Sequence, residues 1–368
     1  MKKYRTAVLG IGVRGRTHLK GLLESGRFEI VALCDIDASK MEAAARDFSL
    51  DVPLYTDAET MLKEQHPEVF VFLTLPNLRL SMLHLAEKYN VHAVSLEKPM
   101  AESLQEAHEM LEICRRAGIK AVVCHQQKYL SQMQMLKQRI DAGEIGEITR
   151  IHVNTQPWLA QLGTHYIDYA LWAGGGHRAK WVIGHAHGTA TLADSHPSPD
   201  HILGEFQLDS GVHVYLDCGY LAGGHLGEEY ADIDNRLTVY GTHGYVWAET
   251  DGYWGAFTRA TNGELLLGKE PGWYHHQEKQ IQTPYYISYA QWLDDEVKVH
   301  DCNIEISYHG YEILEGICLS ALNHTRVDLP ITNFDYEPVF DQMRRVFPDI
   351  GTKPRKLYDG KQPRKEAD

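Results

Sequence analysis

Short apolar runs alternate with helical patterns through the first 125 residues of this 368-residue chain. Runs that are apolar throughout, rather than at every second position, are typical of parallel strands buried on both faces by helices. The pattern therefore predicts an α/β domain with a doubly wound parallel sheet. The expected strands are Thr6–Gly10, Glu29–Asp35, Val69–Pro76, Val91–Pro99 and Lys120–Gln126, and the expected helices are His18–Ser25, Ser39–Phe48, Ala58–Glu64, Leu80–Tyr89 and Leu104–Ala117.

The pattern changes after Gln126, where longer strands with alternating polarity begin. Alternation is typical of an antiparallel sheet with one covered face, so we expect an α+β second domain built on a large, mostly antiparallel open sheet. The expected divisions are residues 1–125, residues 126–335 and a polar tail of residues 336–368 that we cannot place. The expected strands are Ile148–Thr155, Trp181–Gly188, His201–Gln207, Val212–Asp217, Arg236–Tyr240 and Tyr245–Glu249, and the expected helices are Leu130–Ala142, Thr164–Trp172, Ile287–Val299 and Tyr308–Leu322.

Composition excludes several classes of function. A net charge of −14 argues against a broad nucleic-acid-binding surface, which requires a positive patch. No apolar run is long enough to span a membrane, and the N-terminus leads directly into a strand, so we expect neither a membrane span nor a secretory signal. The six cysteines are scattered without a C-x-x-C pair, which favours reduced thiols and a cytoplasmic location.

Three glycines follow the first expected strand in the pattern G-x-G-x-x-G. This spacing permits a tight turn, close approach of a pyrophosphate to the backbone, and close helix–strand packing. Asp35 ends the second strand 20 residues after the third glycine, where its carboxylate can accept both hydrogen bonds of a ribose diol and would repel a 2′-phosphate. NAD is therefore the expected cofactor. We assign cofactor contacts to Gly10, Ile11, Gly12, Gly15 and Asp35.

A plain turn with Asp35 as a strand-end cap is the alternative for this segment. Asp37 is interpreted separately, as the N-cap of the following helix. The segment Thr74–Asn77 closes the third strand, and ligands of doubly wound sheets bind at the carboxyl ends of strands. Thr74, Pro76 and Asn77 are therefore assigned to the cofactor, although a simple Pro-Asn turn explains them too.

Glu97, Lys98 and Pro99 end the fourth strand. A lysine at a buried strand terminus can donate to a substrate hydroxyl and, when partly desolvated, loses its proton more easily. The alternative is a surface lysine whose ammonium reaches solvent. His165 and Asp168 lie three residues apart on an expected helix and share one face, which makes His165 a candidate general base. With 21 histidines in the chain, a structural histidine is the alternative.

Taken together and in this order, these motifs and the segment Ala142–Ile148 resemble the Gfo/Idh/MocA oxidoreductases, which include glucose–fructose oxidoreductase and inositol dehydrogenases. The resemblance covers about residues 4–330. It implies a Rossmann domain that binds NAD, a second domain that often mediates oligomerisation, and a sugar or polyol substrate. It also implies that Lys98 and His165 act at the reacting carbon, and that Glu97 and Pro99 shape the cofactor side.

The sequence departs from this family at three positions. Gln161 stands where many such dehydrogenases carry an aspartate four residues before the histidine, and an amide cannot stabilise an imidazolium by charge. Either His165 acts without that partner or it uses Asp168. Leu80 replaces a usual histidine, and Gln126 and Lys128 stand in the segment that usually carries an arginine, so we assign both to the cofactor.

Two further groups of residues have side chains suited to ligand binding. His185 and His187 share one strand face at a spacing compatible with metal ligation, but strand alternation explains them equally well, and no metal is predicted. Sugars stack on aromatic rings, so Trp158, Tyr274 and His276 are assigned to a carbohydrate pocket with Gln161 and Asp168. Aromatic residues buried in the core are the alternative.

The sequence thus predicts an NAD-dependent dehydrogenase that transfers hydride between nicotinamide and a carbinol carbon of a sugar, glycoside or cyclic polyol. A homodimer or homotetramer is expected. One alternative is a glycosidase that uses NAD in transient oxidation and elimination. Another is a non-catalytic sensor that binds NAD or a sugar.

Overall fold

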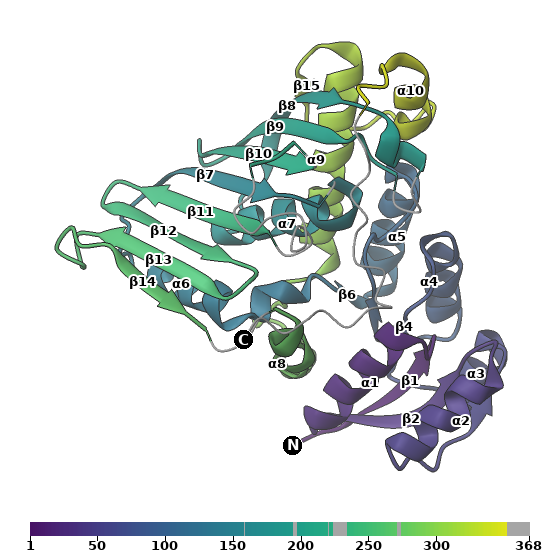
Figure 1. Cartoon of the computed structure of the whole chain (residues 1–368). Helices are drawn as coiled ribbons and strands as arrows, with labels where there is room; N and C mark the ends of the chain where they lie inside the picture. Colours follow the sequence, from purple (N-terminus) through teal and green to yellow (C-terminus); the bar gives the residue numbers. More distant parts are fainter. Residues whose placement is uncertain (158, 194–196, 220, 224–233, 271–273, 352–368) are drawn as a thin grey trace. The chain divides into compact units, whose positions relative to one another are not determined.

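The computed structural model describes residues 1–157, 159–193, 197–219, 221–223, 234–270 and 274–351 (Figure 1). The chain forms two compact units. The first contains Met1–Leu130 and His275–Tyr311, and the second contains Ser131–Tyr274 and the residues from Glu312 onward. The expected boundary at residue 125 lies close to the first crossing between units, but the later return of the chain to the first unit was not expected.

The first unit is built on a six-stranded parallel sheet in the order β3-β2-β1-β4-β5-β6. This order, with the first strand central and connections running both ways from it, is the doubly wound topology that the apolar runs predict. The strands are β1 (Tyr4–Leu9), β2 (Phe28–Cys34), β3 (Leu54–Tyr55), β4 (Val69–Phe72), β5 (Ala93–Leu96) and β6 (Lys120–Val123). The connecting helices are α1 (Val13–Glu24), α2 (Ala38–Asp47), α3 (Ala58–Gln65), α4 (Arg79–Lys88) and α5 (Leu104–Ala117).

Local chemistry sets the ends of these helices. Asp37 caps α2 by accepting a hydrogen bond from the backbone N–H of Ser39 at 3.1 Å, which confirms its predicted role. Ser103 caps α5 in the same way, and Gly118 ends α5 with a φ of +66° that favours glycine.

Helix α8 (Tyr274–Asp294) packs against this first sheet although it is distant in sequence. Its side chains Tyr285, Tyr286 and Tyr289 are fully buried in a core cluster that includes Phe28 of β2. The sequence pattern predicts that this helix begins at Ile287, and that start is wrong. Pro284 lies inside the helix, where the missing N–H and the ring normally exclude proline.

The second unit carries a nine-stranded sheet in the order β14-β13-β12-β11-β7-β10-β9-β8-β15. All neighbouring strands are antiparallel except β7 and β10. The strands are β7 (Ile148–Thr155), β8 (Ala179–His187), β9 (His201–Leu208), β10 (His213–Gly219), β11 (Asn235–Gly241), β12 (Gly244–Glu249), β13 (Tyr253–Thr258), β14 (Leu266–Lys269) and β15 (Val327–Asp328). The last three of these were not predicted.

Helices α6 (Ser131–Asp141), α7 (Thr164–Ala173) and the second half of α9 (Ile304–Asn323) cover one face of this sheet. The contact with α9 is close, because a Cβ added at Gly184 or Gly204 would lie 2.3 Å or 2.8 Å from atoms of Ile317. Part of the unplaced tail forms α10 (Val339–Val346), whose Arg344 donates to the carbonyl of Leu192. No helix in the described part of the chain combines the length and the apolar character needed to cross a bilayer.

Candidate active site

The glycine-rich turn joins β1 to α1 at the carboxyl edge of the parallel sheet. Gly10 has a φ of +88°, and a Cβ there would lie 2.8 Å from the carbonyl oxygen of Leu73. A Cβ on Gly15 would lie 2.0 Å from the carbonyl oxygen of Gly10, so the helix approaches the strand more closely than any other residue allows. A Cβ on Gly12, in contrast, would meet no atom within 4 Å. The turn therefore presents open backbone at the start of α1, as an anion site at a helix N-terminus requires.

Asp35 follows β2 directly beside this turn. Its Oδ2 accepts a hydrogen bond from the backbone N–H of Ile11 at 2.6 Å, and its Oδ1 accepts one from the N–H of Asp37 at 3.0 Å. These two bonds fix the carboxylate beside the glycine turn, and a carboxylate retains further acceptor capacity for a ribose diol. The side chain of Ile11 itself is buried in the core.

The surface around the turn has the mixed character of a nucleotide site. Val13, Ile36 and Leu75 follow β1, β2 and β4, and their side chains are 85 %, 92 % and 70 % exposed. Large apolar groups at strand ends suit the flat faces of the aromatic bases of a dinucleotide. Within the described residues, the buried Oγ1 of Thr74 and the Nε and Nη1 of Arg79 have no hydrogen-bond partner. These residues therefore fit a ligand that brings both aromatic surface and polar groups.

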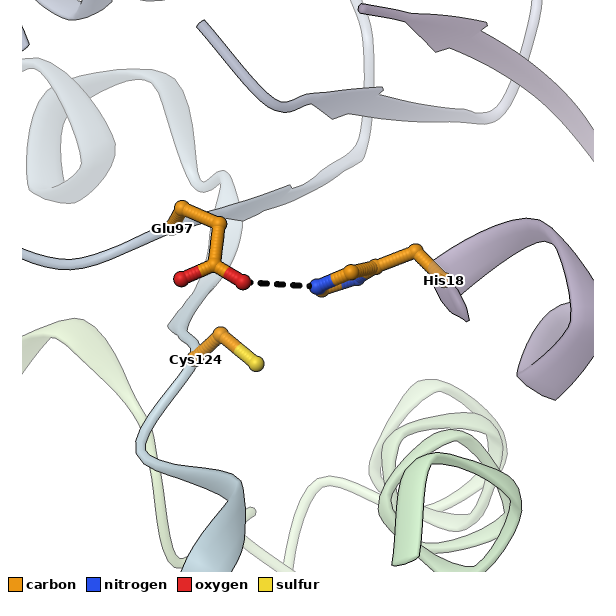
Figure 2. Close-up of side chains that lie close together, drawn as sticks. All are labelled: His18, Glu97 and Cys124. Carbon is orange, nitrogen blue, oxygen red and sulfur yellow. Dashed lines mark hydrogen bonds and ion pairs between the residues drawn. The ribbon is translucent and has the colours of Figure 1, made fainter. Parts of the chain in front are cut away.

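Glu97 follows β5 and is the centre of a buried ionic cluster (Figure 2). Its Oε1 accepts from Nε and Nη2 of Arg14, both at 2.9 Å, and lies 3.0 Å from Nε2 of His18. Burial raises the pKa of this carboxyl, but the charge of Arg14 and the hydrogen bond from His18 outweigh burial and hold the pKa well below its ordinary value. Glu97 is therefore ionised at neutral pH.

Cys124 lies beside the same pair, and one ligand-type atom each of His18, Glu97 and Cys124 lies within 4.8 Å of the others. Within the described residues, this is the one group of three or more side chains with that geometry, and neither His185 nor His187 joins such a group. The cation at Glu97 is the guanidinium of Arg14, and burial raises the pKa of the Cys124 thiol. Both facts favour a hydrogen-bonded cluster over a metal centre.

Lys98 follows Glu97 and is joined to Pro99 by a cis peptide bond. Burial lowers the pKa of its ammonium from 10.5 to about 8, with Arg14 and Arg79 acting in the same direction and Glu97 opposing them. Arg79 also donates to the carbonyls of Thr74 and Lys98, at 2.9 Å and 3.4 Å, and so ties the ends of β4 and β5 together. An amine with this pKa exchanges protons near neutral pH, as acid–base chemistry requires.

His165 lies in the first turn of α7 in the second unit, after a short π-helix (Leu159–Gly163). Its Nδ1 lies 2.7 Å from the hydroxyl of Tyr169, within hydrogen-bond distance. The hydroxyl of the neighbouring Tyr166 bonds to Oγ1 of Thr250 at 2.7 Å and anchors α7 to the end of β12. Asp168 is fully buried one residue before Tyr169.

The remaining assigned residues fall into two groups. Pro76 and Asn77 form a 3-10 turn after β4, while Gln126 and Lys128 are buried after β6. Lys128 donates to the backbone carbonyl of Asp301 at 2.6 Å, which gives its ammonium a structural contact within the first unit. Trp158 and the side chains of Gln161, Tyr274 and His276 lie outside the described residues.

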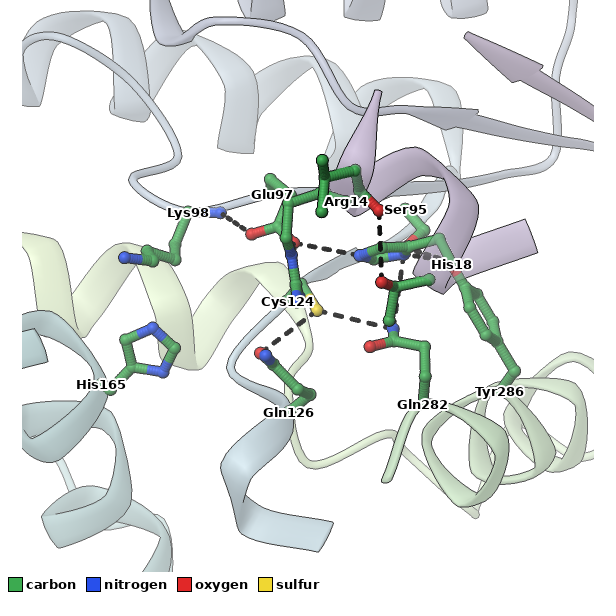
Figure 3. Close-up of polar contacts among 12 residues, drawn as sticks. Arg14, His18, Ser95, Glu97, Lys98, Cys124, Gln126, His165, Gln282 and Tyr286 are labelled. Atoms are coloured by element: carbon green, nitrogen blue, oxygen red, sulfur yellow. Dashed lines mark hydrogen bonds and ion pairs between the residues drawn. The ribbon is translucent and has the colours of Figure 1, made fainter. Parts of the chain in front are cut away.

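Several residues of the cluster were not expected from the sequence. They include His18, Gln282 and Tyr286, which surround Glu97 and Cys124 (Figure 3). His18 lies three residues after Gly15, so a histidine at this fixed distance from the glycine turn was an available signal. Nothing local marks Gln282 or Tyr286, because their contacts depend on the return of α8 to the first unit.

A doubly wound parallel sheet with a glycine-rich first turn and an acidic residue after β2 defines a dinucleotide-binding protein. Two family models support this class. Residues 4–125 match the oxidoreductase family with an NAD-binding Rossmann fold, and residues 133–247 match the GFO/IDH/MocA C-terminal domain. Together the two matches include well over half of the chain. The chain belongs to the Gfo/Idh/MocA oxidoreductase family, and its first unit contains an NAD-binding Rossmann domain.

Individual relatives add detail. D-apiose dehydrogenase of Paraburkholderia graminis is 30% identical over 238 residues, which are 60% of this chain and 61% of that protein. 2,7-Anhydro-N-acetylneuraminate hydratase of Mediterraneibacter gnavus is 26% identical over 65% of this chain and 58% of its own length. The chain thus spans about three fifths of these relatives. The crystal structure of an Agrobacterium radiobacter oxidoreductase with NAD+, L-tartaric acid and magnesium shares the fold, with a TM-score of 0.75, 17% identity, and coverage of 89% of this chain and 98% of that one.

Proposed function

We propose that this protein is an NAD-dependent dehydrogenase acting on a CH–OH group of a sugar, glycoside or cyclic polyol. The observation that carries the proposal is Lys98, an amine with a pKa of about 8 at the carboxyl end of β5 in an NAD-binding domain. An ordinary surface lysine would remain fully protonated and hydrated there. The kinship with D-apiose dehydrogenase supports a carbohydrate as the substrate class.

Separate residues bind the cofactor, orient the substrate and transfer the proton. The open backbone at Gly12 and the N-terminus of α1 hold the pyrophosphate, and Asp35 accepts the ribose hydroxyls. Bound nicotinamide supplies the hydride acceptor. Lys98 donates a hydrogen bond to the substrate oxygen and orients it. His165 takes the hydroxyl proton at Nε2, because its Nδ1 bonds to Tyr169. In the reverse direction, His165 returns that proton to the oxygen of the carbonyl substrate.

The proposal is tested with two variants. Lys98→Ala and His165→Ala should each abolish turnover of any active sugar found in a panel, as followed by absorbance of the reduced cofactor. NAD binding measured by calorimetry should remain, because neither side chain holds the phosphates or the adenosine ribose. Lys120→Ala is the matched control. This lysine begins β6, whereas Lys98 follows the carboxyl end of β5, and it donates to the carbonyl of Trp292. Near-full rates in both variants would contradict the proposal.

A second candidate is a redox-neutral reaction in which NAD is reduced and reoxidised within each cycle. The relative in Mediterraneibacter gnavus supports it, because its name is that of a hydratase and it matches a larger share of this chain than the apiose enzyme does. Stoichiometry decides between the two. Cleavage or hydration of a glycoside without net formation of NADH favours this candidate, whereas one NADH per substrate favours the dehydrogenase. Tight NAD binding without turnover of any sugar would instead indicate a sensor.

We further propose that the protein self-associates through the face of the nine-stranded sheet that α6, α7 and α9 leave uncovered. That face carries a band of aromatic and histidine rings in mutual contact: His152, Trp181, His213, Tyr215, Tyr240, Tyr245 and Phe257. Leu203 and Tyr215 are 43 % and 40 % exposed there. Aromatic residues are enriched at interfaces between subunits. Light scattering of the purified protein tests this, and a monomer at micromolar concentration would refute it.

A cytoplasmic location is proposed as well. All six cysteines are buried and free. Proteins of oxidising compartments commonly use cysteine pairs as disulfides, whereas isolated buried thiols suit a reducing environment. Fractionation of cells that produce the protein would test this location.

A further inference from the structure

The four side chains behind Glu97 come from three separate elements of the first unit. His18 lies on α1, Gln282 and Tyr286 lie on α8, and Ser95 lies on β5. All four are buried, and His18 has no exposed surface. Figure 3 shows them gathered on the side of Glu97 that faces away from Lys98. Buried polar groups are costly unless every bond is satisfied, so the direction of each hydrogen bond here is constrained.

The tautomer of His18 follows from its two neighbours. Burial lowers the pKa of the imidazole, which is therefore neutral and carries a single N–H. Glu97 is an ionised acceptor, so that N–H is on Nε2, 3.0 Å from the carboxylate. Nδ1 must then accept, and it does so from the hydroxyl of Tyr286 at 2.6 Å and from the amide of Gln282 at 3.3 Å.

Tyr286 also accepts a hydrogen bond, from Ser95. Its hydroxyl oxygen lies 3.4 Å from Oγ of Ser95, which donates to it, and burial raises the pKa of the phenol well above its ordinary value. Every proton in the series therefore points the same way, from Ser95 through Tyr286 and His18 to Glu97. Removal of the Tyr286 hydroxyl would also permit the opposite tautomer, because Gln282 could present its Oε1 to Nδ1. The lone pair of Nε2 would then face the carboxylate.

Glu97 in turn acts on Lys98. Besides burial, the titratable groups of the first unit that act on the pKa of the Lys98 ammonium are Glu97 and, more weakly, Cys124, which raise it, and Arg14 and Arg79, which lower it. The backbone N–H of Lys98 also bonds to Oε2 of Glu97 at 3.3 Å. A change in the charge or orientation of Glu97 therefore changes how much of Lys98 is protonated at neutral pH.

We propose that His18 and Tyr286 are positioning residues, which hold Glu97 ionised and oriented toward Arg14 and so set the protonation of Lys98. The significance of this for turnover rests on the proposed function, in which Lys98 contacts the substrate oxygen. The effect on Lys98 itself does not, because it can be measured without a substrate.

The experiment compares Tyr286→Phe with Tyr289→Phe. Both tyrosines are fully buried on α8, one turn apart. Each substitution removes only a hydroxyl. The hydroxyl of Tyr289 donates to the backbone carbonyls of Val94 and Lys120, so its loss removes these hydrogen bonds and leaves those of His18 in place. Glu97→Gln sets the upper limit of the effect, because it removes the charge completely.

The readout is the rate at which Lys98 reacts with a trace of acetic anhydride between pH 6 and 10, measured by mass spectrometry of its peptide in the folded protein. The midpoint should lie near pH 8 in the wild type and in Tyr289→Phe. In Tyr286→Phe it should fall by about half a unit, which makes Lys98 roughly three times more reactive at pH 7. Glu97→Gln should lower it further.

Equal midpoints in the two tyrosine variants would overturn the proposal, as would an unchanged midpoint in Glu97→Gln. Thermal melting of each variant verifies that the labelled protein is folded. If the midpoints move as expected while no sugar is oxidised, the proposed activity fails and the positioning role stands.

Discussion

Nε2 of His18 lies 3.0 Å from Oε1 of Glu97, although 79 positions separate the two residues in the chain. This bond joins the helix that starts at the glycine turn to the strand end that carries Lys98. The helix that follows the glycine turn and the strand end that carries Lys98 therefore share one buried polar cluster.

The first prediction concerns Asp35. Asp35→Ser should weaken NAD binding by roughly 10- to 100-fold, because the variant loses the carboxylate that accepts from the ribose and is held in place by Ile11, a loss of about 1–3 kcal/mol in all. Calorimetric titration with NAD measures the change in Kd. Asp37→Asn is the control, since that residue is an exposed helix cap two positions away. Equal affinities in the two variants would argue against the ribose contact.

The second prediction separates folding from binding at the glycine turn. Gly15→Ala should destabilise the first unit, because the new Cβ would lie 2.0 Å from a backbone oxygen that cannot move aside. Gly12→Ala should leave the apo protein as stable as the wild type, since its Cβ meets open space, but should weaken NAD binding by occupying that space. Urea unfolding and NAD titration of both variants provide the comparison. A Gly12→Ala variant with wild-type NAD affinity would place the pyrophosphate elsewhere.

The third prediction is that Lys98 reduces stability. Its pKa is about 8 in the folded protein against an ordinary 10.5, so the unfolded chain binds this proton more tightly. The resulting loss of stability is complete below pH 8 and disappears as the pH rises toward 10.5. Lys98→Met should therefore raise the free energy of unfolding at pH 7 by about 1–3 kcal/mol while abolishing activity. Urea denaturation checks this. Lys120→Met, which loses the bond to the Trp292 carbonyl and the ion pair with Glu296, should be neutral or destabilising.

The fourth prediction concerns Glu315 on α9. Burial raises the pKa of its carboxyl from 4.5 to about 7, against a bond from the hydroxyl of Tyr336. The folded state then binds this proton more tightly, so the contribution of Glu315 to stability falls as the pH rises from 4.5 to 7. Glu315→Gln should remove this dependence and be more stable than the wild type at pH 8 by about 1–3 kcal/mol.

Urea unfolding at pH 5 and pH 8 measures this difference. Glu305→Gln on the same helix is the control, because Glu305 is an exposed carboxylate paired with Arg115 rather than a buried one. A Glu315→Gln variant that loses stability between these pH values as the wild type does would show that another group is responsible.

The parallel sheet could be predicted from the sequence because each of its longer strands is a continuous apolar run next to a helical pattern. Strand β2 (Phe28–Cys34), for example, differs by one residue at each end from the predicted Glu29–Asp35. The missed strands lack that signal. β13 contains a glycine, β14 has only four residues and lies at the edge of its sheet, and β15 has two. Short edge strands depend on their neighbours rather than on their own composition.

The site was predictable only where its residues are close in sequence. Glu97 and Lys98 are adjacent, and Asp35 lies at a fixed distance from the glycines. The bond between His18 and Tyr286 spans 268 positions. Helical spacing shows that Tyr286 and Tyr289 share a buried face, but not which sheet that face contacts. In addition, Pro284 lies inside α8. Because proline is normally excluded from helix interiors, the sequence does not predict the first half of this helix.

The return of α8 to the first sheet has a practical consequence for dissection of the molecule. A fragment that stops at Leu130 would leave Phe28 without its covering rings from Tyr286 and Tyr289, whose centroids lie 5.5 Å and 6.2 Å away. Such a truncated polypeptide should aggregate when expressed alone, and a synthetic peptide of residues 275–311 added in trans should rescue it. Contiguity along the gene is therefore a poor guide to where this nucleotide-binding module can be cut.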